Sequence, residues 1–199
     1  HDKFIILIAD MPGHGISAAL ILSAFKAIAN DVLRADDNHI VKSSGEILTL
    51  LNKNLIKLNL NVYPTACCLI LDKNNNSIEY SNAGHPYPFI IHSSKEPTIF
   101  KDNEMLLGVT DFVYSTKKIE LNEGDKLILY SDGITEINDK IDNMLTFGFY
   151  DFVQFIEKNK QLQDGILFSE LFSKLSQIHG STDFDDDIML LTISLSNLK

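Results

Sequence analysis

The order in which hydrophobic patterns follow one another along the chain restricts the folds it can adopt. An apolar run over residues 4–9 ends beside a Pro-Gly turn and predicts a buried strand. From Ile16 to Leu33 the residues are apolar nearly all round, which predicts a central helix packed on several sides. Ser43 and Glu46 have the spacing of a capping box and begin a second, amphipathic helix.

Short strand-like runs separated by turn clusters fill the middle of the chain. The predicted strands cover residues 65–71, 77–82, 87–91, 112–119 and 126–130. Two helical patterns follow Asp132, and a last strand is predicted over residues 188–195. This order is typical of an α+β fold in which helices cover antiparallel sheets. Because the chain has no internal repeat or long linker, we expect a single domain over residues 1–199.

The balance of charge excludes two classes of partner. The 199 residues include 27 acidic and 17 basic side chains, a formal net charge of −10. Such an excess of negative charge argues against binding to nucleic acid or to an anionic membrane. Arg34 is the only arginine, so several arginines cannot together clamp a phosphate group.

The two cysteines and the apolar stretches bear on location. Cys67 and Cys68 are neighbours inside an apolar run, which predicts buried thiols on alternate faces of a strand rather than a disulfide. This cysteine usage favours a reducing compartment. No apolar stretch approaches the roughly 18 residues of a membrane span, and the N-terminus lacks a signal-peptide pattern. We therefore expect a cytoplasmic protein without membrane contact.

Carboxylates occur at three places where an apolar strand is predicted to end or begin. Asp10 and Asp132 each follow a predicted strand and precede a turn residue, and residues 185–187 are three aspartates that open the last strand. If these strand ends meet, the carboxylates would repel one another unless hard divalent cations such as Mg²⁺ or Mn²⁺ bind between them. An ordinary turn or cap role is the alternative for any one of them, and spacing alone does not prove convergence.

Four ordered motifs reveal a family resemblance. They are DMPGHG at residues 10–15 before an Ala-rich helix, NAGHP at 82–86, GDKLILYSDGITE at 124–136 and DDDIMLL at 185–191. Together they resemble the metal-dependent type 2C protein phosphatases, the PPM family. The similarity is to the bacterial branch of stage II sporulation and stress-response serine phosphatases. It implies an α-β-β-α sandwich of two largely antiparallel sheets flanked by helices.

The resemblance also implies a centre of two Mn²⁺ or Mg²⁺ ions. By motif matching, Asp10 bridges the two ions and the backbone carbonyl of Met11 contributes at the second ion. Asp132 and Asp186 complete the first site. The triple aspartate allows a slip of one position, so Asp187 is a further candidate ligand, and Asp185 and Asp187 are alternatively second-layer or cap residues.

Other motif residues have two interpretations each. His14 lies between two glycines at a helix start, where it could approach the phosphate or donate a proton to the leaving oxygen. A turn histidine that bonds the local backbone is an equally good account. For Asn82, Gly84 and His85 we favour a structural turn over direct chemistry. Thr65 and Thr135 match common family positions, and we favour strand-edge and capping roles for them.

The implied activity is hydrolysis of phosphoserine or phosphothreonine in a protein by metal-activated water, that of a phosphoprotein phosphatase. The single arginine agrees with phosphate recognition by metal ions. The implied substrate is an anti-sigma factor antagonist in bacterial signalling, and an upstream sensory or receiver domain is the implied regulator. The alternatives are a non-catalytic pseudophosphatase or interaction domain, and a metal hydrolase acting on a small phosphoester.

The chain departs from the family pattern at its start. Family members carry a Gly-Gly-Asp segment on a strand upstream of the first metal aspartate, and the sequence before Asp10 is too short to contain it. We therefore expect an N-terminally truncated fragment of a longer regulatory protein, lacking one or more strands. The acid in that segment would help to hold the second ion, so we expect that site to be weak or empty and activity to be low. An uncovered sheet edge also invites homodimerisation.

Overall fold

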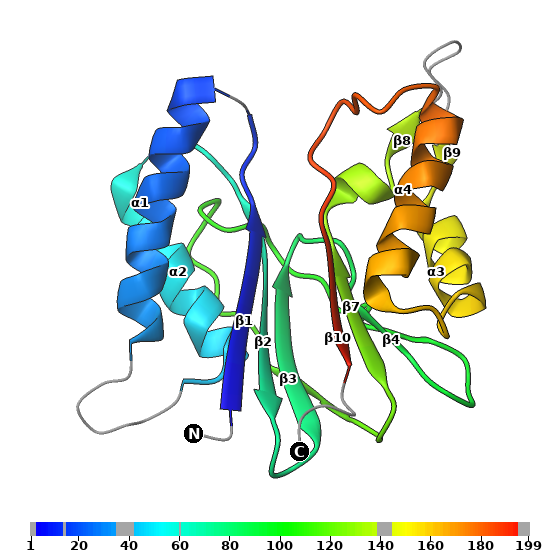
Figure 1. Ribbon diagram of the computed structural model, residues 1–199. Coiled ribbons are helices and arrows are strands. Elements are labelled where there is room, and N and C mark those ends of the chain that lie inside the picture. Colours follow the sequence, from blue (N-terminus) through cyan, green and yellow to red (C-terminus); the bar gives the residue numbers. More distant parts are fainter. Residues whose placement is uncertain (1–2, 14, 35–41, 60, 139–144, 195–199) are drawn as a thin grey trace. The chain divides into compact units, whose positions relative to one another are not determined.

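A computed structural model describes residues 3–13, 15–34, 42–59, 61–138 and 145–194 of the chain (Figure 1). The chain divides into two compact units, each built from two segments. Unit 1 comprises His1–His85 and Lys101–Leu121, and unit 2 comprises Pro86–Phe100 and Asn122–Lys199. Each unit has its own antiparallel sheet, its own pair of helices and its own hydrophobic core. The prediction of one domain over the whole chain stays a prediction.

The sheet of unit 1 has four antiparallel strands in the order β1-β2-β3-β6. They are β1 (Lys3–Asp10), β2 (Thr65–Asp72), β3 (Ser77–Ala83) and β6 (Lys117–Glu120). In the register of the first pair, Asp10 lies opposite Thr65. The turn from β2 to β3 forms because the Asp72 carboxylate accepts hydrogen bonds from the amides of Asn74 and Asn75, at 3.0 and 3.1 Å.

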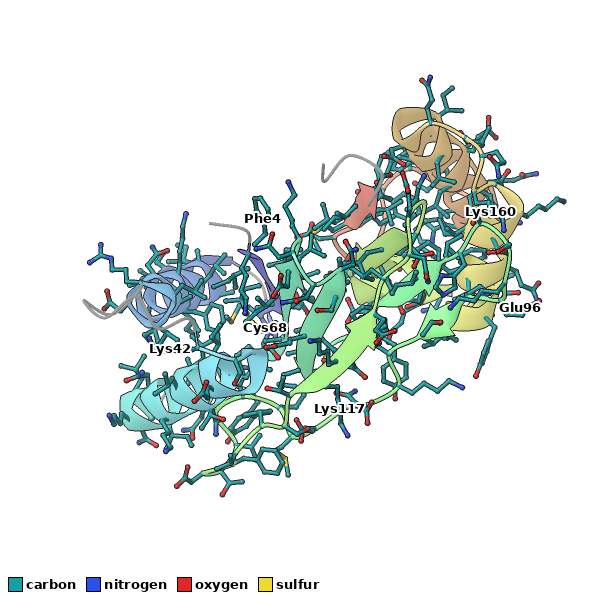
Figure 2. All side chains as sticks on the ribbon, turned by 90° about the horizontal axis from the view of Figure 1, so that it is seen from below. Phe4, Lys42, Cys68, Glu96, Lys117 and Lys160 are labelled. Atoms are coloured by element: carbon teal, nitrogen blue, oxygen red, sulfur yellow. The ribbon has the colours of Figure 1, made fainter. Side chains whose placement is uncertain are left out.

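Two helices pack on one face of this sheet, α1 (Gly15–Leu33) and α2 (Ser44–Leu58), as Figure 1 shows. The predicted capping box is confirmed: the Ser43 hydroxyl accepts from the Glu46 amide, and the Glu46 carboxylate accepts from the Ser43 amide at 2.7 Å. Cys67 and Cys68 are both buried on β2, as predicted. Cys68, labelled in Figure 2, belongs to the core that these helices cover.

Two predictions of burial in unit 1 are wrong. Strand β1 was expected to be buried, but Ile8 is its only buried residue, because within the described residues β1 is the edge strand of its sheet. Helix α1 was expected to pack on several sides. It buries only part of its surface, and Ile16 and Leu20 are 83% and 67% exposed. Periodicity identified the helix correctly, but an apolar surface does not by itself supply a partner.

The strand predicted over residues 112–119 forms only at its end, as β6. The preceding residues leave the ladder because Tyr114 is held elsewhere. Its amide donates to the Thr49 hydroxyl of α2 at 3.0 Å, and its hydroxyl donates to the carbonyl of Met105 at 2.8 Å. These bonds give the segment an irregular path over the core of unit 1.

The main sheet of unit 2 is also antiparallel, in the order β10-β7-β4-β5. Its strands are β4 (Phe89–Ile91), β5 (Thr98–Ile99), β7 (Lys126–Tyr130) and β10 (Leu190–Ser194), and a small separate sheet pairs β8 (Ile137–Asn138) with β9 (Leu145–Phe147). Helices α3 (Phe149–Lys158) and α4 (Asp164–His179) bury the predicted apolar faces against β4 and β7. Within the described residues, no helix is long and apolar enough to cross a bilayer. The predicted α+β class is confirmed.

Candidate metal centre

Asp10 is the last residue of β1, and its side chain is exposed. The chain then turns sharply into α1 through Pro12 and Gly13, where Gly13 has a φ of 99°. This left-handed conformation suits glycine, in agreement with the predicted turn. Met11, between the strand and the turn, packs its side chain against the core of unit 1. His14 lies outside the described residues.

The Asn82–His85 turn supports the strand end opposite Asp10. The side chain of Asn82 donates to the carbonyl of His85 and accepts from its amide, both at 2.9 Å. The ring of His85 lies 2.9 Å from the hydroxyl of Thr65, which is the register partner of Asp10. Gly84 has a φ of 77°, and a Cβ there would collide with Leu106. We favour a structural role for this motif, and its contacts agree with that role.

In unit 2, Ser131 joins the end of β7 to the segment before β10. Its hydroxyl donates to the carbonyl of Asp187 at 2.7 Å and accepts from the amide of Met189 at 2.9 Å. Its own amide donates to the carbonyl of Met189 at 3.1 Å. The last strand was predicted from residue 188, and it begins at Leu190 instead because the Ser131 side chain takes the place of ladder bonds there.

Asp132 follows Ser131 and opens a single 3₁₀ turn, Asp132–Ile134. Its half-buried carboxylate accepts from the amide of Gly133 at 3.0 Å, and its carbonyl accepts from the amide and hydroxyl of Thr135. Gly133 touches the other acidic segment, since a Cβ at this position would lie 2.5 Å from the carbonyl oxygen of Asp187. The local capping role of Thr135 is confirmed.

The three aspartates 185–187 are exposed. Asp186 repeats the geometry of Asp132, because its carboxylate accepts from the next amide, that of Asp187, at 2.7 Å. Unit 2 therefore brings Asp132 beside Asp186 and Asp187 through Ser131 and Gly133, while Asp10 belongs to unit 1. Across the described ranges, no three His, Cys, Asp or Glu side chains form a ready group of metal ligands.

The donor chemistry fits a hard divalent cation. Asp132, Asp186 and Asp187 offer only carboxylate and backbone oxygens, which Mg²⁺ and Mn²⁺ prefer. The thiols are not suitable ligands, because burial raises the pKa of Cys68 to about 12 and also raises that of Cys67. Our sequence interpretation used Asp132 of the Ser-Asp-Gly motif and treated Gly133 as a turn residue, but it missed Ser131. A hydroxyl residue directly before an aspartate at a strand end was the available signal.

Comparison with known proteins gives one family over nearly the whole chain. The sequence profile described as Stage II sporulation protein E (SpoIIE) matches residues 1–196. Phosphoserine phosphatase RsbU of Bacillus subtilis (strain 168) is 31% identical over 136 residues, covering 66% of this chain and 38% of RsbU. The chain spans about a third of the length of three curated relatives, between 33% and 38% of each.

Solved structures share the fold. The SiaA-PP2C domain of Pseudomonas aeruginosa superposes with a TM-score of 0.83 at 18% identity, covering 97% of this chain and 75% of that one. RsbX in complex with magnesium gives a TM-score of 0.65 at 17% identity, covering 96% of this chain and 80% of RsbX. At these identities the structures establish the fold, which is that of the PP2C-type domains. The profile match settles the family, and the chain belongs to the SpoIIE family of PP2C-type domains.

Proposed function

We propose that this chain is the catalytic domain of a metal-dependent protein phosphatase that hydrolyses phosphoserine or phosphothreonine in a protein. The observation that carries the proposal is the junction of Asp132 with Asp186 and Asp187 in a SpoIIE-family chain. Asp132 and Asp186 are 54 positions apart in the chain, yet their segments present oxygen donors at neighbouring backbone positions. An ordinary turn or cap role for each aspartate does not require the two segments to meet. RsbU, a relative named a phosphoserine phosphatase, supports the reaction class.

The proposed ligands are Asp10, the carbonyl of Met11, Asp132 and Asp186, with Asp187 as the alternative to Asp186. Their oxygens suit Mn²⁺ or Mg²⁺, and RsbX, which has the same fold, is described in complex with magnesium. Two ions are proposed. When bound, such ions would supply the Lewis acidity that polarises a phosphoryl group and lowers the pKa of water, so that water can lose a proton and attack as a stronger nucleophile.

The residues around these ligands have the task of orienting them. The following amide fixes one oxygen of Asp132 and one of Asp186, which limits the rotamers available to each carboxylate. Ser131 ties the backbone beside Asp132 to that of Asp187 and Met189, which limits how far the two acidic segments can separate. Because these ligands are already oriented, cation binding costs less conformational entropy. His14 is retained as a candidate proton donor to the leaving oxygen.

The proposed substrate is a phosphorylated regulatory protein of the anti-sigma factor antagonist type in the bacterial cytoplasm. The similarity to RsbU supports this choice. An upstream sensory or receiver domain and homodimerisation belong to the same proposal. The non-catalytic interaction domain remains the second candidate, because no three acidic, histidine or cysteine side chains are grouped within the described parts of the chain.

Phosphate release from a phosphoserine protein with Mn²⁺ tests the proposal. We expect Asp132→Asn to lower kcat/KM about 100-fold, the upper range for loss of a group that organises a metal site. Asp111→Asn, which changes an exposed loop acid in unit 1, is the matched control and should leave the rate unchanged. An unchanged rate in Asp132→Asn would reject the proposed site. A wild-type protein that binds its partner but releases no phosphate would favour the interaction domain.

A further inference from the structure

His179 has an unusual hydrogen-bond environment at the end of α4. The residue is only 2% exposed. Its Nδ1 lies 2.9 Å from the carbonyl oxygen of Asn138 in β8, and its Nε2 lies 3.1 Å from the carbonyl oxygen of Asp183. Both neighbours are acceptors and neither has a proton to give.

The ring lies between two backbone carbonyls from different parts of the chain. A ring N–H can donate to a carbonyl oxygen, and a buried carbonyl left without a donor costs free energy. His179 is also in the last turn of α4, so the ring brings the end of this helix against both neighbours.

The segment that His179 holds is the one that carries the proposed ligand Asp186. The ring of Phe184 stacks on the imidazole, with 5.2 Å between centroids and 25° between planes. His179 thus anchors Asp183 and Phe184 on one side of the acidic run, and Ser131 anchors Asp187 on the other. The loop is fixed on both sides of Asp186.

We infer that His179 is a positioning residue whose two ring nitrogens link β8 to the loop of Asp186. Asn138 follows Asp132 by six positions, so the same ring connects the chain after one proposed ligand to the chain before another. His179 touches neither ligand and acts only through the backbone. The functional meaning rests on the proposed metal site, whereas the anchoring of the loop can be tested without it.

The first test is hydrogen exchange of residues 183–189 in the metal-free protein near neutral pH, comparing wild type with His179→Phe. We expect faster exchange of this segment in the variant, because both ring contacts to backbone carbonyls are lost. Unchanged exchange of this segment would overturn the inference. Because no metal is added, this result is independent of whether the chain is a phosphatase.

The second test is Mn²⁺ titration by calorimetry with hydrogen exchange of residues 183–189. His179→Phe keeps a stacking ring but removes both ring nitrogens, and His179→Gln retains one donating group. We expect Mn²⁺ affinity to fall about tenfold in His179→Phe and less in His179→Gln, with faster exchange confined to this segment.

His92→Gln is the matched control. His92 is another buried histidine of unit 2, held between Asp125 and Thr98 at 2.7 and 2.8 Å, and it contacts neither acidic segment. The His92→Gln substitution should lower the stability of the protein without changing its Mn²⁺ affinity. If the His179 variants bind Mn²⁺ and exchange like wild type, or if His92→Gln weakens Mn²⁺ equally, the inference is overturned. If the wild type binds no Mn²⁺, the proposed function fails, while hydrogen exchange in the metal-free protein still decides whether His179 anchors the loop.

Discussion

Gly133 is the residue at which the two acidic segments of unit 2 touch. A Cβ in its place would lie 2.5 Å from the carbonyl oxygen of Asp187 and 3.1 Å from the carbonyl carbon. Both neighbours are backbone atoms, which Ser131 holds in place. The segment that carries Asp186 therefore occupies the space that a side chain at position 133 would need.

Gly133→Ala should push this segment away. We expect it to lower the free energy of unfolding by about 1–3 kcal/mol, the usual cost of overpacking, and to weaken Mn²⁺ binding. Urea unfolding and Mn²⁺ titration measure the two effects. Gly165→Ala is the control, because a Cβ at this α4 position meets no atom within 4 Å and alanine favours a helix. Equal behaviour of the two variants would contradict the close contact.

Sequence patterns indicated the individual acids but not the residues that hold them. Asp10, Asp132 and Asp186 could be selected because each stands next to a turn residue or a strand. The position of Ser131 before an aspartate was a weak signal and His179 had none, because their partners lie 56 and 41 positions away in the chain. No local periodicity reports such a contact.

At the scale of elements, helix α2 shows how a cap couples stability to pH. The backbone and side chain of Ser43 donate to the Glu46 carboxylate and lower its pKa below the usual 4.5. A carboxyl group with a lowered pKa in the folded state stabilises the fold above its unfolded pKa. That contribution is lost as the pH falls below 4.5 and through the lowered value.

We therefore expect Glu46→Gln to flatten the pH dependence of stability in this acidic range. The wild-type protein should lose stability faster than the variant as pH decreases below 4.5, measured by urea unfolding at a series of pH values. Glu96→Gln, at an exposed loop position, should keep the wild-type slope. Identical slopes for Glu46→Gln and wild type would contradict the role of the cap.

Ser43→Ala tests the same cap from its other side. The substitution removes the hydroxyl that accepts from the Glu46 amide, and we expect a loss of about 1 kcal/mol in the free energy of unfolding. Ser93→Ala, at an exposed position outside any helix, is the comparison and should change stability little. A loss of equal size in both variants would contradict the prediction.

Whether a helix or strand could be predicted from the sequence depended on its length. The helices and longer strands were found from caps and periodicity, whereas β5 and β8 contain two residues each, too few to show a pattern. The burial of β1 and α1 was overestimated because an apolar composition predicts a buried face only when a neighbour covers it.

At the scale of the molecule, the proposed metal centre predicts a ligand-dependent stability. A cation that binds only the folded protein raises the free energy of unfolding by about 2.7 kcal/mol at 100 times its dissociation constant. We expect Mn²⁺ to raise the Tm of the wild type and a chelator to reverse the rise. Asp132→Asn should lose the shift and Asp111→Asn should keep it. An equal shift in Asp132→Asn would place the cation elsewhere.

Chemical labelling of the two adjacent cysteines reports whether unit 1 opens in the native state. Burial raises the pKa of both thiols, that of Cys68 to about 12, so little thiolate is present in the folded protein near neutral pH. We expect iodoacetamide to leave both thiols unmodified in the native state and to label them in urea. A thiol introduced by Ser93→Cys at an exposed position should react promptly. Native labelling of Cys67 and Cys68 at that same rate would contradict their burial.

The path of the chain between the two units limits how the units can be separated. The chain passes from one unit to the other three times, after His85, Phe100 and Leu121. Residues 86–100 supply β4 and β5 to one sheet, and residues 101–121 supply β6 to the other. Neither unit is encoded by one continuous stretch of codons. Because each unit needs two separate segments of the chain, neither unit can be produced alone from one continuous fragment without part of the other.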